Sequence, residues 1–126
     1  MPIAMTRDDE QRRVTVTVSD PWSVEEVVVA GDRQIAGGAW RHGTLYDLHG
    51  STWVPSEPDL LWLVKRGHQQ VALHGARGPV AIVVDGTTSP HLVQCYVQYG
   101  GGTDVVRVFE TSAAAAGWLA AQPVAG

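Results

Sequence analysis

The chain has 126 residues, a length that fits one domain with a substantial core. Hydrophobic residues make up 44% and charged residues 17%, which is typical of a globular protein and excludes a disordered chain. The formal net charge is −4 and the basic residues are scattered, so the basic stripe of a nucleic-acid-binding protein is missing.

Three further features bear on location. The uncharged apolar runs are far shorter than the ~20 residues that cross a membrane. The first ten residues lack the apolar segment of a secretory signal. Cys95 is the single cysteine, which rules out an intrachain disulfide. We therefore expect a cytoplasmic protein with one domain over 1–126, a core of about 12–121 and a flexible tail over 122–126.

The N-terminal part predicts a hairpin followed by a helix. Residues 13–19 alternate apolar and polar side chains, as a half-buried strand does, and residues 3–6 can pair with them across a turn at 7–10. Ser23 and Glu26 have the spacing of a capping box. The helix that follows is predicted to bury one stripe and to end at the two glycines 37–38. The predicted stripe consists of Val24, Val27, Val28, Gly31 and Ile35.

The rest of the chain alternates strands with helices. Strands are predicted at 44–48, 80–84 and 104–109, and helices from Ser56 to about Gly75, from Ser89 to about 99, and over 113–121. This order, β(β)αβαβαβα, predicts an α/β fold. We expect a mixed, mostly parallel sheet of four to five strands with an N-terminal antiparallel hairpin and helices packed on the sheet.

Three segments in this order resemble the STAS-like domains, in particular a small bacterial branch grouped with anti-sigma-factor antagonists and CRAL-TRIO-like proteins. They are Leu45-Tyr46-Asp47-Leu48-His49-Gly50, then Gly78-Pro79-Val80-Ala81-Ile82-Val83-Val84, and finally Val106-Arg107-Val108-Phe109 followed by Ala115, Trp118 and Leu119. The resemblance covers about 12–121. It implies a regulatory module that binds proteins and is not an enzyme.

One position departs from that family's pattern. Antagonists of this kind carry a phosphorylatable serine in a loop that opens a helix, and the matching residue is Ser56, in Pro55-Ser56-Glu57-Pro58. The family's glycine is absent, and the acidic neighbours would oppose a phosphate that the helix N-terminus favours. The alternative is that Ser56 is simply a helix cap.

The strand ends offer a candidate ligand site. Asp47, His49 and Ser51 follow one another at every second position, so they project to the same side at the end of a strand, and Asp85 follows the next strand. Ligands of open α/β sheets bind at this edge. A hydrolase that uses Asp47, His49 and Ser51 remains an alternative. It is disfavoured because the chain has no Gly-x-Ser-x-Gly elbow.

No cofactor or metal is predicted. The five histidines lack the spacing of metal ligands. The glycines at 100–102 follow a predicted helix and precede a strand, which is the reverse of a phosphate-binding loop.

The helix that begins at Ser56 offers a candidate interaction surface. At ~100° per residue, Trp62 falls opposite the buried stripe, beside an arginine and a glutamine. This combination is typical of interface hot spots. The predicted surface consists of Trp53, Ser56, Trp62, Arg66, Gln69 and Leu73.

We therefore predict a non-enzymatic interaction module that binds a protein partner or forms a homodimer. The alternative is a domain that binds a small molecule or a lipid in an apolar pocket between helices and sheet. Its polar anchors would be Tyr46, Tyr96 and Tyr99.

Overall fold

The computed structural model describes residues 3–49, 51, 56–84 and 106–122. These residues form a five-stranded sheet and three helices. The elements in chain order are β1 (Ile3–Asp8), β2 (Arg13–Val18), α1 (Val24–Ala36), β3 (Gly43–Asp47), α2 (Glu57–His74), β4 (Val80–Val83), β5 (Val106–Phe109) and α4 (Ser112–Ala121). The helix predicted from Ser89 and the glycines at 100–102 lie outside the described residues.

The strands follow the order β1-β2-β3-β4-β5 across the sheet. β1 is antiparallel to β2, and every other neighbouring pair is parallel. The predicted α/β fold with its N-terminal hairpin is therefore confirmed. The predicted turn at 7–10 is wrong by two residues, because β1 stays paired as far as Asp8 opposite Arg13.

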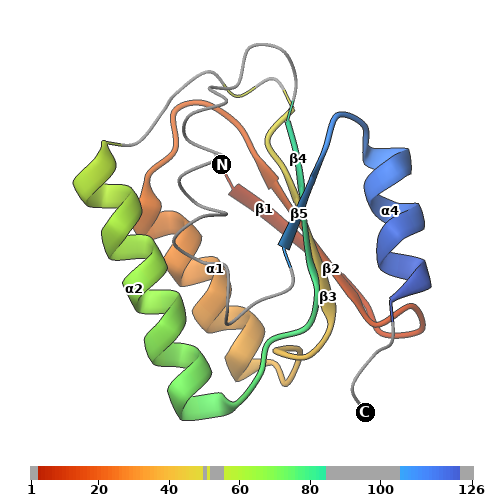
Figure 1. Cartoon of the computed structure of the whole chain (residues 1–126), viewed down its shortest axis with the longest axis horizontal. Helices are drawn as coiled ribbons and strands as arrows, with labels where there is room; N and C mark the ends of the chain where they lie inside the picture. Colours follow the sequence, from red (N-terminus) through yellow and green to blue (C-terminus); the bar gives the residue numbers. More distant parts are fainter. Residues whose placement is uncertain (1–2, 50, 52–55, 85–105, 123–126) are drawn as a thin grey trace.

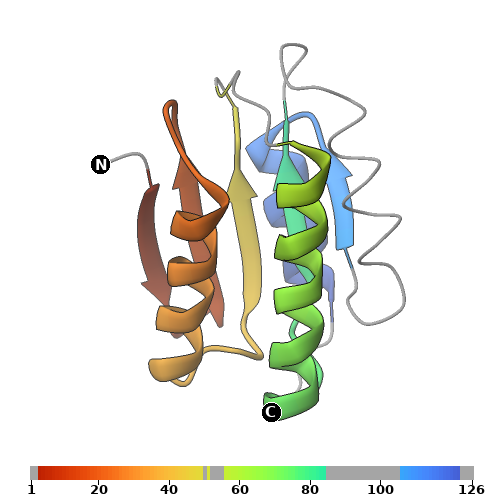
Figure 2. The same cartoon turned by 90° about the vertical axis from the view of Figure 1, so that its left-hand side faces the viewer.

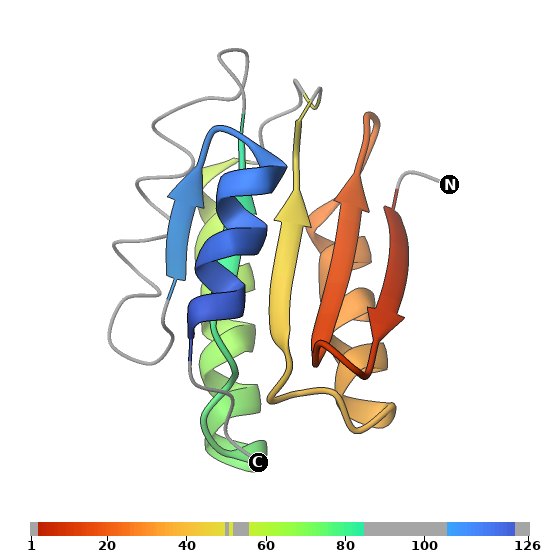
Figure 3. The same cartoon turned by 90° about the vertical axis from the view of Figure 1, so that its right-hand side faces the viewer.

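Helices cover both faces of the sheet, but not evenly (Figure 1). α1 and α2 lie side by side on one face (Figure 2). α4 lies on the other face against β3, β4 and β5 and does not extend over β1, while Arg13 at the start of β2 donates to the Ala116 carbonyl of α4 (Figure 3). β4 is consequently buried along its whole length, as its continuous apolar sequence predicts.

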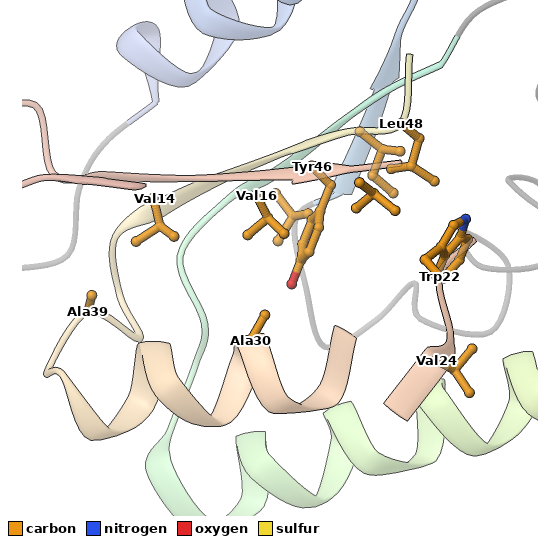
Figure 4. Close-up of a cluster of buried hydrophobic side chains, with 11 residues drawn as sticks. Val14, Val16, Trp22, Val24, Ala30, Ala39, Tyr46 and Leu48 are labelled. Atoms are coloured by element: carbon orange, nitrogen blue, oxygen red, sulfur yellow. The ribbon is translucent and has the colours of Figure 1, made fainter. Parts of the chain in front are cut away.

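The larger core lies between the sheet and the helices α1 and α2. Val14, Val16 and Tyr46 point from the strands towards α1, with Ala30 below Val16 and Tyr46, and Trp22 lies at one end of the cluster (Figure 4). A smaller core on the opposite face consists of Leu45, Ala81, Val83, Ala115 and Leu119. Successive residues of a strand point to opposite faces of the sheet, so β3 and β4 contribute to both cores.

Serine and threonine side chains cap the three helices. The Ser23 Oγ accepts from the Glu26 amide at 3.3 Å and donates to the Glu26 carboxylate at 3.2 Å. The reciprocal bond of the predicted capping box thus uses the serine hydroxyl instead of its amide. Ser56 Oγ accepts from the Asp59 amide, and Thr111 Oγ1 from the Ala114 amide, so Thr111 is the cap of α4. Each cap satisfies an amide that the first turn leaves without a partner.

Candidate functional site

The outward face of α2 carries a stripe of four side chains. Leu60 and Val64 are buried, whereas Trp62 and Leu73 remain 46% and 74% exposed. At ~100° per residue, Trp62, Arg66, Gln69 and Leu73 fall within about 60° of one another around the helix axis. We call these four residues the α2 stripe. Apolar side chains stand at its two ends and polar side chains at its centre.

Contacts with α1 hold the centre of the α2 stripe. Arg66 Nη2 lies 3.5 Å from Asp32 Oδ1, and the same carboxylate oxygen accepts from Gln70 Nε2 at 3.0 Å. The Arg66 side chain is therefore anchored on one side while it still borders solvent. A surface whose side chains are already ordered loses less entropy when a partner binds.

The structure brings together four of the six residues predicted for the interaction surface. Ser56 caps the start of α2 and is exposed, but it stands before the stripe. Trp53 lies outside the described residues. Leu61, which is 41% exposed, is a further large apolar side chain on α2 that the sequence analysis did not single out. The sequence places Leu61 next to Trp62 near the start of the helix, but it does not indicate how far the buried face of that helix extends.

A hollow lies between α1, α2 and the sheet. Val28, Gly31, Asp32, Leu63 and Gly67 line its sides, and Trp40, Tyr46 and Arg77 also line it. The two glycines widen it, because a Cβ at either position would meet nothing within 4 Å. Its volume is about 50 Å³, enough for a few water molecules at ~10–15 Å³ each.

The hollow corrects part of the sequence analysis. The buried residues of α1 are Val24, Ala30 and Gln34. Three other members of the predicted stripe, Val27, Val28 and Ile35, are partly exposed, and all three line the hollow. The apolar stripe predicted for α1 therefore lies partly against α2, and not wholly against the sheet.

Arg77 lines the hollow and has several side-chain partners, although the sequence did not indicate a role for it. Its guanidinium lies over the Trp40 ring, 4.9 Å from the centroid, and donates to the Tyr46 hydroxyl at 3.0 Å. It also donates to Gln34 Oε1 at 3.4 Å. These partners come from separate segments, so no local pattern around Arg77 could indicate them.

At the strand ends, the predicted residues have other partners than a catalytic triad requires. Asp47 Oδ1 accepts from the backbone amide of His49 at 2.9 Å. The Ser51 hydroxyl donates to Asp20 Oδ1 at 3.0 Å and accepts from Trp22 Nε1 at 2.8 Å. Ser51 is 2% exposed. Asp85 lies outside the described residues. The hydrogen bonds of Ser51 thus join the end of β2 to the segment after β3.

The turn between β1 and β2 contains one carboxyl with a shifted pKa. Asp9 Oδ1 accepts from Arg7 Nε and lies 3.1 Å from His42 Nε2. The hydrogen bond from Arg7, followed by that from His42, lowers the pKa of the Asp9 carboxyl from its usual value of 3.8. Arg7 also donates to the carbonyl of Gly37 at the end of α1. These contacts attach the hairpin turn to the helix and to the start of β3.

Within the described ranges, no three side chains of histidine, cysteine, aspartate or glutamate gather closely enough to hold a metal ion. None of the helices in the same ranges has the length and apolar character needed to cross a bilayer. Comparison with protein-family models, with curated proteins and with solved structures finds no match to this chain.

Proposed function

We propose that this chain is a non-enzymatic interaction module that binds a protein through the α2 stripe. The observation that carries the proposal is the exposure of Trp62 and Leu73 on one line of a helix whose opposite face is buried in the core. Trp62 is a large aromatic side chain of the kind that dominates the binding energy at protein interfaces, and Leu73 adds a second apolar contact about three turns further along the helix.

The composition of the α2 stripe supports the same conclusion. Tryptophan and arginine are enriched among the residues that dominate binding energies, and here they stand one helical turn apart. Asp32 orders the Arg66 guanidinium without removing it from solvent. The resemblance to STAS-like domains favours a regulatory role in the cytoplasm.

Site-specific photo-crosslinking in cells tests this proposal. A photoreactive amino acid at position 69 should yield a discrete crosslinked species, because that position lies between Trp62 and Leu73 on the surface. The matched control carries the same group at Ala113, an exposed position on α4. Trp62→Ala combined with Leu73→Ala should abolish the species from position 69. Equal crosslinking at both positions, or a species that survives the double substitution, would contradict the proposal.

A small-molecule-binding function is the second candidate, and the hollow beside Arg77 favours it. A guanidinium over an aromatic ring beside a tyrosine hydroxyl offers polar anchors in a partly apolar setting. Native mass spectrometry of protein purified from cells tests it: a co-purifying mass supports this candidate, and its absence supports the interaction module. The volume of about 50 Å³ suits only a very small ligand, which is why we place this function second.

A hydrolase has weaker support. A nucleophilic serine needs a base within hydrogen-bonding reach of its hydroxyl. The Ser51 hydroxyl donates to the Asp20 carboxylate and not to the histidine of the predicted triad, and it is buried away from any substrate in solution. An unchanged hydrolytic activity in His49→Ala would remove this alternative.

A further inference from the structure

We propose that the partner of the α2 stripe is a second copy of this chain, whose α2 packs antiparallel to the first across a two-fold axis. This inference rests on the proposed function, since it names the protein that the stripe binds. It follows from the order of side chains along the stripe.

The four residues are placed symmetrically along α2. Trp62 and Leu73 lie at equal distances on either side of the point between Gly67 and His68, and so do Arg66 and Gln69. A two-fold axis through that point brings each residue opposite its counterpart. Interfaces with two-fold symmetry use the same patch on both copies and need this self-complementarity.

The pairs that this arrangement creates are chemically complementary. Trp62 of one copy meets Leu73 of the other at both ends, so exposed apolar surface is covered twice. At the centre, Arg66 meets Gln69, whose side-chain oxygen can accept from the guanidinium. A parallel arrangement would instead place Arg66 against Arg66, and the two like charges would repel each other.

The length of the contact is adequate for a weak dimer. Trp62 and Leu73 are about 16 Å apart along the axis, at a rise of 1.5 Å per residue. Three turns of helix from each copy make a contact smaller than a standard interface, as in weak, transient complexes, so we expect a dimer that forms only at high protein concentration. Arg66 is already held by Asp32 in each copy, which reduces the entropy lost on pairing.

Sedimentation equilibrium of the full chain, run from about 1 µM to about 1 mM, tests the inference through charges at position 69. Gln69→Arg creates two contacts between like charges in the dimer, so its dissociation constant should rise roughly tenfold or more. Gln69→Glu creates two ion pairs with Arg66, and its dimer should be tighter at low salt and lose that gain at high salt. Arg66→Glu with Gln69→Arg, made together with Asp32→Asn so that the new carboxylate does not face the one at Asp32, should restore pairing.

Ala120 supplies the control, because it is exposed on α4, on the opposite face of the sheet from α2. Ala120→Arg should leave the dissociation constant unchanged, and thermal unfolding should show that every variant is folded. A monomeric wild-type chain over the whole range, or equal effects of Gln69→Arg and Ala120→Arg, would overturn the inference.

The crosslinking experiment separates failure of this inference from failure of the proposed function. A species at position 69 with the mass of two chains supports both. A species that contains a different protein supports the interaction module and refutes the homodimer. The absence of any specific species refutes both.

Discussion

The Arg77 guanidinium stacks over the Trp40 ring at 4.9 Å from its centroid, and the Trp40 Nε1 donates to the carbonyl of Gly75 at 2.9 Å. These contacts connect the loop after α1 with the loop after α2. Because Arg77 also donates to Tyr46 on β3, the same side chain joins both loops to the sheet. The stacked guanidinium and the Trp40 ring also line the hollow between the helices.

Arg77→Lys should destabilise the fold although it keeps the charge. Lysine lacks the planar group that stacks on Trp40 and bonds to Tyr46 at the same time. We expect the free energy of unfolding to fall by about 1–3 kcal/mol, measured by urea denaturation. Arg33→Lys on the exposed side of α1 is the control and should change it by less than ~0.5 kcal/mol. Similar losses in both variants would show that the stacking contributes little.

Ser51→Ala should remove the connection between β2 and the segment after β3. The substitution removes the hydroxyl that accepts from Trp22 Nε1 and donates to the Asp20 carboxylate. Loss of these two hydrogen bonds should cost about 1–3 kcal/mol, which chemical denaturation can measure. Ser112→Ala, at an exposed position, is the matched control. If Ser51→Ala is as stable as that control, the hydrogen bonds of Ser51 are replaceable by water.

Two glycine substitutions should act in opposite directions. Gly67→Ala should stabilise the protein by about 0.5–1 kcal/mol, because alanine favours a helix and its Cβ meets nothing within 4 Å. Gly78→Ala should cost about 2 kcal/mol or more, because its Cβ would collide with the backbone carbonyls of Arg41 and His42. Thermal unfolding of both variants checks the contrast. A stabilising effect of Gly78→Ala would show that the backbone there moves easily.

Asp9→Asn should lower stability at neutral pH and lose its effect in acid. The folded state lowers the pKa of Asp9 below 3.8, so the ionised carboxylate favours folding. That contribution is present above the usual carboxyl pKa and disappears as the pH falls through the lowered value. The unfolding temperatures of the two proteins, measured from pH 7 down to pH 2, should therefore converge at the acidic end. Curves that stay parallel over this range would contradict the prediction.

Local patterns predicted the elements of the fold well. Alternation along 13–19 and the helical spacing after Ser56 depend on residues close in sequence, and both elements are present. The same helical spacing predicted that Trp62, Arg66, Gln69 and Leu73 share the outer face of α2. Gln34 shows the limit of such patterns. It is buried because its amide donates to the Ala39 carbonyl and to Thr44 Oγ1, partners that hydrophobicity does not reveal.

The parts of the site that could not be predicted depend on long-range contacts. Ser51 bonds to Asp20 and Trp22, which precede it by 31 and 29 positions. Arg77 and Tyr46 are likewise 31 positions apart. A sequence pattern places a residue on a face or at a strand end. The packing of the whole sheet and its loops determines which distant side chain lies next to that residue.

The order of the strands also has a consequence for how the chain folds during synthesis. Each strand of the sheet pairs with the strand made immediately before it. Among the strands that the structure describes, none therefore needs a later strand to be inserted between it and the strand before it. The sheet can grow from its N-terminal edge as the ribosome releases the chain, with β1 and β2 as the first pair. β5 then pairs with β4 at the edge of the sheet, and the strand pairs formed earlier need not rearrange.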